Sequence, residues 1–292
     1  MTESVQQFRS GKGARDENFP VASWLIRKRH RPVILAFYEF VRTADDIADH
    51  PKLGGAEKLV RLDRLETSLL GHGDEPVGLA LFAMLNSRGL TARHAQDLLN
   101  AFRQDVTKHR YANWDELIDY CSRSAMPVGR FVLDLHGEAR NTWPASDALC
   151  AALQIINHLQ DCKADYRKLD RVYIPLDALA AQGIGVEALA DDRAGPALKD
   201  CLRALAVRAD CLLQESEGLP ASVSDKRLAL EVSIIQSLAS RLLAILQQRD
   251  PLSERVHLTK SETLAVAAIG GARRLLRRRF GAATSAQRYQ TP

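Results

Sequence analysis

Aromatic and strand-forming residues are scarce in this 292-residue sequence: aromatic residues make up only 6%, and runs of Val, Ile and Thr are few. Leu and Ala dominate instead, which favours helices over sheets. Two apolar series recur at helical spacing, namely Leu198, Leu202, Leu205, Ala209 and Leu212, and Ile235, Leu238, Leu242 and Ile245. We therefore expect an all-α protein.

A C-x-x-C pair is also missing, and the five cysteines are scattered along the chain. This pattern fits reduced thiols better than a disulfide framework or a zinc site. The first residues lack the apolar core of a secretory signal, and no stretch of about 18 residues is both apolar and uncharged. We therefore expect a cytoplasmic protein without a membrane-spanning helix.

No strong excess of charge of one sign is present, because 40 Lys and Arg oppose 36 Asp and Glu. The overall charge therefore gives no reason to expect a nucleic-acid partner. Long linkers and internal repeats are absent as well. Since the ends are polar and carry no apolar stripe, we expect a single domain over 18–281, with flexible segments at 1–17 and 282–292.

The segment FYEFVRTADDIADH carries the first candidate site. Tyr38, Arg42, Asp45 and Asp49 are spaced i, i+4, i+7 and i+11, so a helix presents them on one face. Asp46 lies to one side as an auxiliary group. Two carboxylates one turn apart, beside an Arg, can hold hard cations and the phosphate oxygens that those cations neutralise. Taken alone, such a pair is also typical of a solvated surface.

A second polar face follows in QIINHLQDCKAD, where Gln154, Asn157, Asp161 and Asp165 again fall at helical spacing within an otherwise apolar helix. A structural hydrogen-bond network would explain the two amides but would leave two carboxylates without partners. Facing carboxylates repel one another and favour a bound cation. Mg²⁺ is the natural candidate, because carboxylates together with substrate phosphates are its usual ligands.

With two further segments, YCSRSAMPVG at 120–129 and RVYIP at 171–175, the sequence resembles the squalene, dehydrosqualene and phytoene synthases. These head-to-head prenyl synthases match it over most of the chain. The resemblance implies a single all-α isoprenoid synthase domain, a helical bundle around a deep apolar cavity with the two aspartate motifs at its mouth. It also implies a magnesium-dependent enzyme that acts on prenyl diphosphates.

The resemblance further implies roles for individual residues. Asp45, Asp49, Asp161 and Asp165 would bind the magnesium diphosphate, and Arg42 and Arg171 would contact phosphate oxygens. The remaining residues that it places at the site are Tyr38, Phe19, Asp46, Tyr120, Gln154, Asn157 and Tyr173. Tyr120 has a plainer interpretation as a helix-end aromatic packed on Met126 and Val128.

Asn18 and Phe19 stand where many family members carry a Ser-Phe pair, so a hydroxyl expected near the diphosphate is missing. This departure weakens the case for condensation of two donors. The segments ENFPVASW, TADDIAD and MPVG are most similar to a bacterial branch linked to hopanoid synthesis. Members of that branch convert presqualene diphosphate and water into hydroxysqualene and diphosphate without a nicotinamide reductant. Head-to-head condensation of two farnesyl or geranylgeranyl diphosphates is the alternative.

The run Arg273–Arg279, with five arginines beside Leu275 and Leu276, allows two interpretations. It can contact anionic lipid at the inner membrane surface, where apolar substrates and other enzymes of the squalene pathway would be at hand. It can equally form a solvated terminal helix. The alternative to an enzyme is a catalytically silent helical scaffold or a nucleic-acid-binding bundle that uses this run. The two aspartate faces argue against this alternative.

Overall fold

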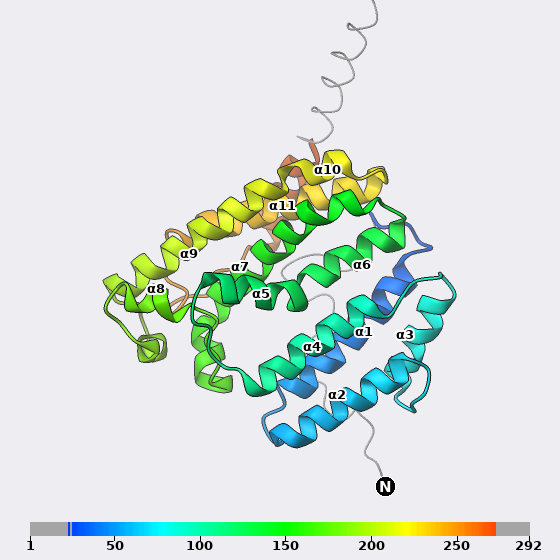
Figure 1. Cartoon of the computed structure of the whole chain (residues 1–292). Helices are drawn as coiled ribbons and strands as arrows, with labels where there is room; N and C mark the ends of the chain where they lie inside the picture. Colours follow the sequence, from blue (N-terminus) through cyan, green and yellow to red (C-terminus); the bar gives the residue numbers. More distant parts are fainter. Residues whose placement is uncertain (1–22, 24, 273–292) are drawn as a thin grey trace, which may run out of the picture.

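The computed structural model describes residues 23 and 25–272 of the chain (Figure 1). Its named helices are α1 (Arg31–Ala48), α2 (Gly55–Leu69), α3 (Pro76–Asn86), α4 (Arg93–Thr107), α5 (Trp114–Ser124), α6 (Met126–His136), α7 (Trp143–Leu169), α8 (Leu176–Ala180), α9 (Pro196–Glu215), α10 (Leu219–Ser222) and α11 (Lys226–Leu246). Short 3-10 turns η2 (Arg140–Thr142), η3 (Val186–Ala190) and η4 (Ser216–Gly218) connect some of them. Residues 260–272 are helical as well.

Local sequence signals account for the helix boundaries. α1, α7 and α9 each have a proline in the first turn, where its missing N–H is not needed for a helical hydrogen bond. Asn113 and Asp225 cap α5 and α11 with side-chain oxygens that accept backbone N–H groups. The Pro- and Gly-containing segments between apolar stretches therefore separate the helices as their composition predicts.

The 27-residue helix α7 is central to the bundle and packs against α5, α6, α9 and α11, whereas α1 to α4 pack on one another (Figure 1). Beyond α7, the chain runs back beside the segment that follows α4. The Val172 N–H donates to the His109 carbonyl at 2.9 Å, and the Leu176 N–H donates to the Tyr111 carbonyl at 2.9 Å. These bonds fix the RVYIP segment against the segment that follows α4.

The prediction of an all-α fold is confirmed, since residues 25–272 form no strand beyond one isolated bridge between Arg110 and Val172. The predicted stripe on α9 is buried from Leu198 to Ala209, but Leu212 is half-buried and Leu213 enters the core in its place. All five cysteines are free thiols.

α11 is long and apolar enough to cross a membrane by length and composition. More than half of its most apolar window is buried inside the bundle, however, where the helix packs against α9 and α7. A buried core helix passes the same test, so this finding does not support a membrane span. The ends that we expect to be flexible, Phe19 and the Arg273–Arg279 run lie outside the described residues, as do both limits of the predicted domain 18–281.

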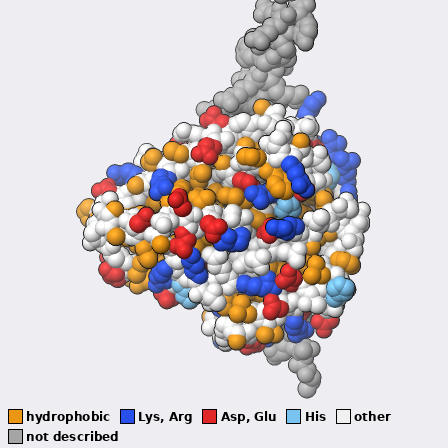
Figure 2. Space-filling view, in the orientation of Figure 1, with side chains coloured by type: hydrophobic (Ala, Val, Ile, Leu, Met, Phe, Trp, Pro, Cys, Tyr) orange, Lys and Arg blue, Asp and Glu red, His pale blue; other side chains and the backbone are white. Residues whose placement is uncertain are grey.

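Charged side chains are mixed over the described surface that faces the viewer in Figure 2. Acidic and basic groups are interspersed there, with apolar side chains between them. The low net charge of the sequence is thus accompanied by local mixing on this face, which is common for a surface in contact with water.

Candidate active site

The first aspartate motif occupies the last turns of α1 and its cap. Arg42 binds two neighbours at once: Nη1 lies 2.9 Å from Asp45 Oδ2, and Nη2 lies 2.9 Å from Asp46 Oδ1. Asp46 is buried, whereas Asp45 is partly exposed. Asp46 thus serves to hold Arg42, and Asp45 is the carboxylate of this pair that remains accessible. Tyr38 lies half-buried two turns earlier on the same helix.

Asp49 caps α1 and forms an ion pair with Arg171, whose Nη1 lies 2.5 Å from Asp49 Oδ1. Arg171 is 6% exposed. Its other nitrogens donate to main-chain oxygens, Nη2 to Ala48 and Nε to Asp105, each at 3.2 Å. The guanidinium has five N–H groups. Three of them make these bonds, and the other two have no partner among the residues that the structure describes. Arg171 therefore ties the end of α1 to the end of α4.

The second aspartate motif lies on the C-terminal half of α7, with Asp161 exposed and Asp165 partly buried. Burial raises the pKa of Asp165 to about 8, and the charges of Asp161 and Asp49 add to the increase. Burial likewise raises the pKa of Asp45, with Asp49 as the next cause. Because Asp49 on α1 acts on Asp165 on α7, the two motifs are close enough to repel each other.

The sequence predicts four mutually repelling carboxylates, and in the structure two of them have an arginine partner. Asp45 is paired with Arg42 and Asp49 with Arg171. Within the described part of the chain, no three His, Cys, Asp or Glu side chains stand together as a ready-made metal site. The remaining repulsion and the all-oxygen donor set still fit Mg²⁺, which usually takes one or two carboxylates and completes its shell with phosphate and water.

Beside the carboxylates lies a buried cluster that the motifs only partly predict. The Tyr120 and Tyr173 hydroxyls donate to Asp105 at 2.8 and 3.0 Å, one to each carboxylate oxygen. Burial raises the pKa of Asp105 to about 6, although Arg171 and the two hydroxyls act in the opposite direction. Tyr120 is thus more than a helix-end aromatic, because its hydroxyl is part of this network. Tyr111 stacks on Tyr173, with ring centroids 5.6 Å apart.

Three residues of this cluster are missing from the sequence-based site: Asp105, Tyr111 and His158, whose ring is stacked on Tyr173. Asp105 falls four and seven residues after the buried Ala101 and Leu98. Asp105 is therefore recognisable in the sequence as a carboxylate on the apolar face of an amphipathic helix. The sequence signal for His158 is weaker, since a histidine next to buried residues is also a common core residue.

The remaining predicted residues lie on α7. Gln154 is half-buried, and its Nε2 lies 3.2 Å from His158 Nε2. Asn157 is also half-buried and follows one helical turn later. The structure thus brings Tyr120, Gln154 and Tyr173 together around His158.

This helical bundle, with carboxylates of α1 and α7 near each other, has the architecture of an α-helical isoprenoid synthase. The crystal structure of a squalene synthase from Alicyclobacillus acidocaldarius superimposes on 84% of this chain and 92% of its own, with a TM-score of 0.71 and 31% sequence identity.

A family model described as squalene/phytoene synthase matches residues 13–262, and the chain belongs to this family. Hydroxysqualene synthase of Rhodopseudomonas palustris is 58% identical over 280 residues, which are 95% of this chain and 96% of that protein. Hydroxysqualene synthase of Sinorhizobium fredii is 54% identical over 277 residues, 94% of this chain and 95% of that protein.

Proposed function

We propose that the protein converts presqualene diphosphate and water into hydroxysqualene and diphosphate, a step of squalene and hopanoid biosynthesis. One observation carries the proposal: relatives named hydroxysqualene synthase are 54% and 58% identical over nearly the whole chain. The accessible carboxylates on α1 and α7 and the buried aromatic cluster beside them support it.

The proposed ligands for Mg²⁺ are Asp45 and Asp49 on one side and Asp161 and Asp165 on the other. When bound, Mg²⁺ would neutralise the diphosphate and favour its departure. Arg42 and Arg171 have a double role in this proposal. Each holds a carboxylate of α1 in place, and the two N–H groups that Arg171 has left can donate to a phosphate oxygen.

The remaining site residues would act on the hydrocarbon part of the substrate. Departure of diphosphate leaves a carbocation, which survives only where water is scarce. Tyr120 and Tyr173 are 3% and 8% exposed, and their rings, together with those stacked on them, would supply the aromatic surroundings that attract a cation. Gln154, Asn157, Tyr38 and Phe19 complete the proposed lining of an apolar cavity, and Asp46 supports it through Arg42.

A cytoplasmic location at the inner membrane surface is part of the proposal. Substrate and product are hydrocarbons of low solubility in water, so contact with the bilayer and with other enzymes of the squalene pathway would ease their transfer. The basic run Arg273–Arg279 is the proposed contact with anionic lipid. Nucleic acid has no role in this function.

Head-to-head condensation of two prenyl diphosphates is the second candidate, and the 31% identity with a solved squalene synthase favours it. The two functions are distinguished by incubating the purified protein with Mg²⁺ and either presqualene diphosphate or farnesyl diphosphate, with and without NADPH, followed by mass spectrometry. We expect hydroxysqualene from presqualene diphosphate in both reductant conditions, with ¹⁸O in the hydroxyl when labelled water is used. Squalene as the main NADPH-dependent product, or turnover of farnesyl diphosphate alone, would support condensation.

A further inference from the structure

His158 packs against the buried aromatic cluster and has no role in the function proposed so far. Its ring is stacked on that of Tyr173, with centroids 3.7 Å apart and planes inclined by 17°. The ring of Tyr120 follows at a centroid distance of 6.1 Å. His158 is 7% exposed and directly follows Asn157 on α7. The imidazole is therefore fixed among the side chains that surround the proposed carbocation.

Gln154 is the one described residue that hydrogen-bonds to this ring, through Nε2 of the amide and Nε2 of the imidazole at 3.2 Å. An amide NH₂ group only donates, so the ring nitrogen accepts and Nδ1 carries the proton. If the Gln154 amide is rotated by 180°, its Oε1 accepts a hydrogen bond from the Nε2–H of His158. The imidazole then carries its proton on Nε2 and its lone pair on Nδ1. Gln154 thus holds the ring in place in either tautomer and leaves Nδ1 for another partner.

The proposed reaction requires a group of this kind. A water molecule that captures a carbocation must be held at one carbon and must lose a proton as its oxygen forms the new bond. Both hydroxyls of the neighbouring tyrosines already donate to Asp105. Burial, and secondarily the charge of Arg171, lower the pKa of His158 to about 3, so its ring is neutral. In the tautomer in which Gln154 Oε1 accepts the Nε2–H, the lone pair at Nδ1 is available to a water molecule.

We propose that His158, oriented by Gln154 and Tyr173, holds the water that captures the carbocation and accepts its proton. This inference rests on the proposed function, because it assigns the capture step of that reaction. The C–O bond of the diphosphate ester has already broken, and its electron pair left with the diphosphate. A lone pair of the water oxygen forms the new C–O bond, and one proton moves to the imidazole. The imidazolium then returns that proton to diphosphate or to solvent.

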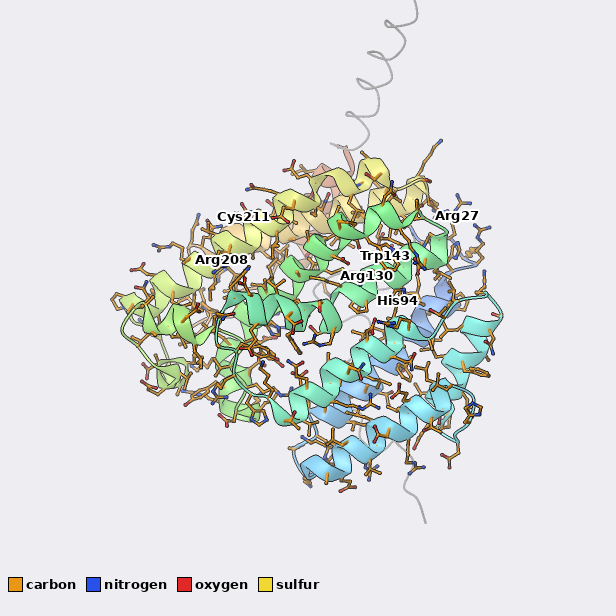
Figure 3. The ribbon with its side chains drawn as sticks, in the orientation of Figure 1. Arg27, His94, Arg130, Trp143, Arg208 and Cys211 are labelled. Carbon is orange, nitrogen blue, oxygen red and sulfur yellow. The ribbon has the colours of Figure 1, made fainter. Side chains whose placement is uncertain are left out.

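The alternative is that His158 only fills space against Tyr173. His158→Phe separates the two roles, because a phenyl ring keeps the stacking and removes both nitrogens. His158→Gln offers polar atoms without an imidazole. His94→Phe is a matched control, since His94 is also buried and contacts an aromatic ring, that of Trp143 at a centroid distance of 5.7 Å (Figure 3). His94 lies eleven residues before Asp105, which is about 16 Å along α4.

The experiment measures products and residual presqualene diphosphate, with Mg²⁺ in ¹⁸O-labelled water, together with the melting temperature of each variant. For His158→Phe we expect continued consumption of substrate, with the ratio of hydroxysqualene to hydrocarbon products lower by about tenfold or more, as for loss of a positioned base. His158→Gln should retain more alcohol than His158→Phe, and His94→Phe should keep the wild-type ratio.

An unchanged alcohol ratio in His158→Phe would overturn the inference. So would a folded His158→Phe variant that no longer consumes substrate, since that result assigns His158 to ionisation or binding. If His158→Phe does not fold, the decision rests on His158→Gln, where a wild-type alcohol ratio contradicts the proposal. Failure of the wild-type protein to form hydroxysqualene would instead reject the proposed function.

Discussion

Replacing Asp49 or Asp165 by Asn should change the free energy of unfolding in opposite directions, although both carboxylates belong to the same proposed site. Asp49 is paired with the buried Arg171. Asp165 is partly buried, and its pKa is raised by burial and by Asp161 and Asp49. From the sequence alone, loss of any one repelling carboxylate should leave the fold intact. The pairing with Arg171 changes that expectation for Asp49.

The magnitudes follow from these environments. Removal of one partner from a buried ion pair costs about 3–5 kcal/mol. The Asp49 side chain is 36% exposed, so solvent screening reduces the expected loss to about 2 kcal/mol. For Asp165, the pKa increase from 3.8 to about 8 sets an upper bound of about 6 kcal/mol. Relaxation and water penetration reduce the gain expected for Asp165→Asn to about 1–2 kcal/mol.

The gain for Asp165→Asn must depend on pH in a defined direction. A carboxyl group whose pKa is higher in the folded protein binds its proton more tightly there, so wild-type stability falls as pH rises between about 4 and about 8. Asn does not titrate. The stability difference between the variant and the wild type should therefore be near zero at pH 4 and reach its full value at pH 8.

Urea unfolding of the metal-free proteins, with EDTA present, at pH 5.5 and pH 8 measures these differences. Asp192→Asn is the control, because Asp192 also pairs with cations of α7 but is 88% exposed, and its replacement should leave stability unchanged. Added Mg²⁺ with diphosphate should stabilise the wild type more than Asp165→Asn. A loss of stability in Asp165→Asn, or a gain of equal size at both pH values, would refute the reasoning.

Three further predictions concern turnover and packing. Asp161→Ala should abolish turnover while circular dichroism and melting temperature stay close to wild type, because Asp161 is exposed; wild-type turnover would contradict its proposed role. Tyr120→Phe removes one buried hydrogen bond to Asp105 and should cost about 1–2 kcal/mol in urea unfolding, whereas no loss would contradict a structural role for that hydroxyl. Gly129→Ala places a Cβ within 2.6 Å of two α7 side chains and should cost about 1–3 kcal/mol. Gly195→Ala, which has open space, serves as its control, and equal effects would contradict the close contact between α6 and α7.

The sequence was sufficient for the fold class and for the two aspartate motifs, because helical periodicity is a local property of the chain. Asp45 and Asp165 were found from spacing within single helices. The partners of these carboxylates could not be found in the same way. Arg171 meets Asp49 across 122 positions of sequence, and no periodicity encodes a contact between residues so far apart.

The buried cluster also depends on contacts between distant segments, which local sequence patterns do not predict. Asp105 was detectable as a carboxylate on an apolar helix face, but its two tyrosine donors come from α5 and from the segment after α7. His158 has no distinctive spacing. Its importance follows from the ring stacked on it and from the amide beside it, and both are properties of the folded chain.

The RVYIP segment explains how motifs far apart in sequence come to act on one site. Asp170 ends α7 in the left-handed conformation, with φ of 51°, and turns the chain back so that the Arg171 N–H donates to the Asp165 carbonyl at 3.1 Å. The Arg171 side chain then binds Asp49 and the Asp105 carbonyl, and two residues later Tyr173 donates to the Asp105 carboxylate. One short segment thus sets the positions of α1, α4 and α7 relative to one another. Geometry at the proposed diphosphate site therefore depends as much on Arg171 as on the aspartates themselves.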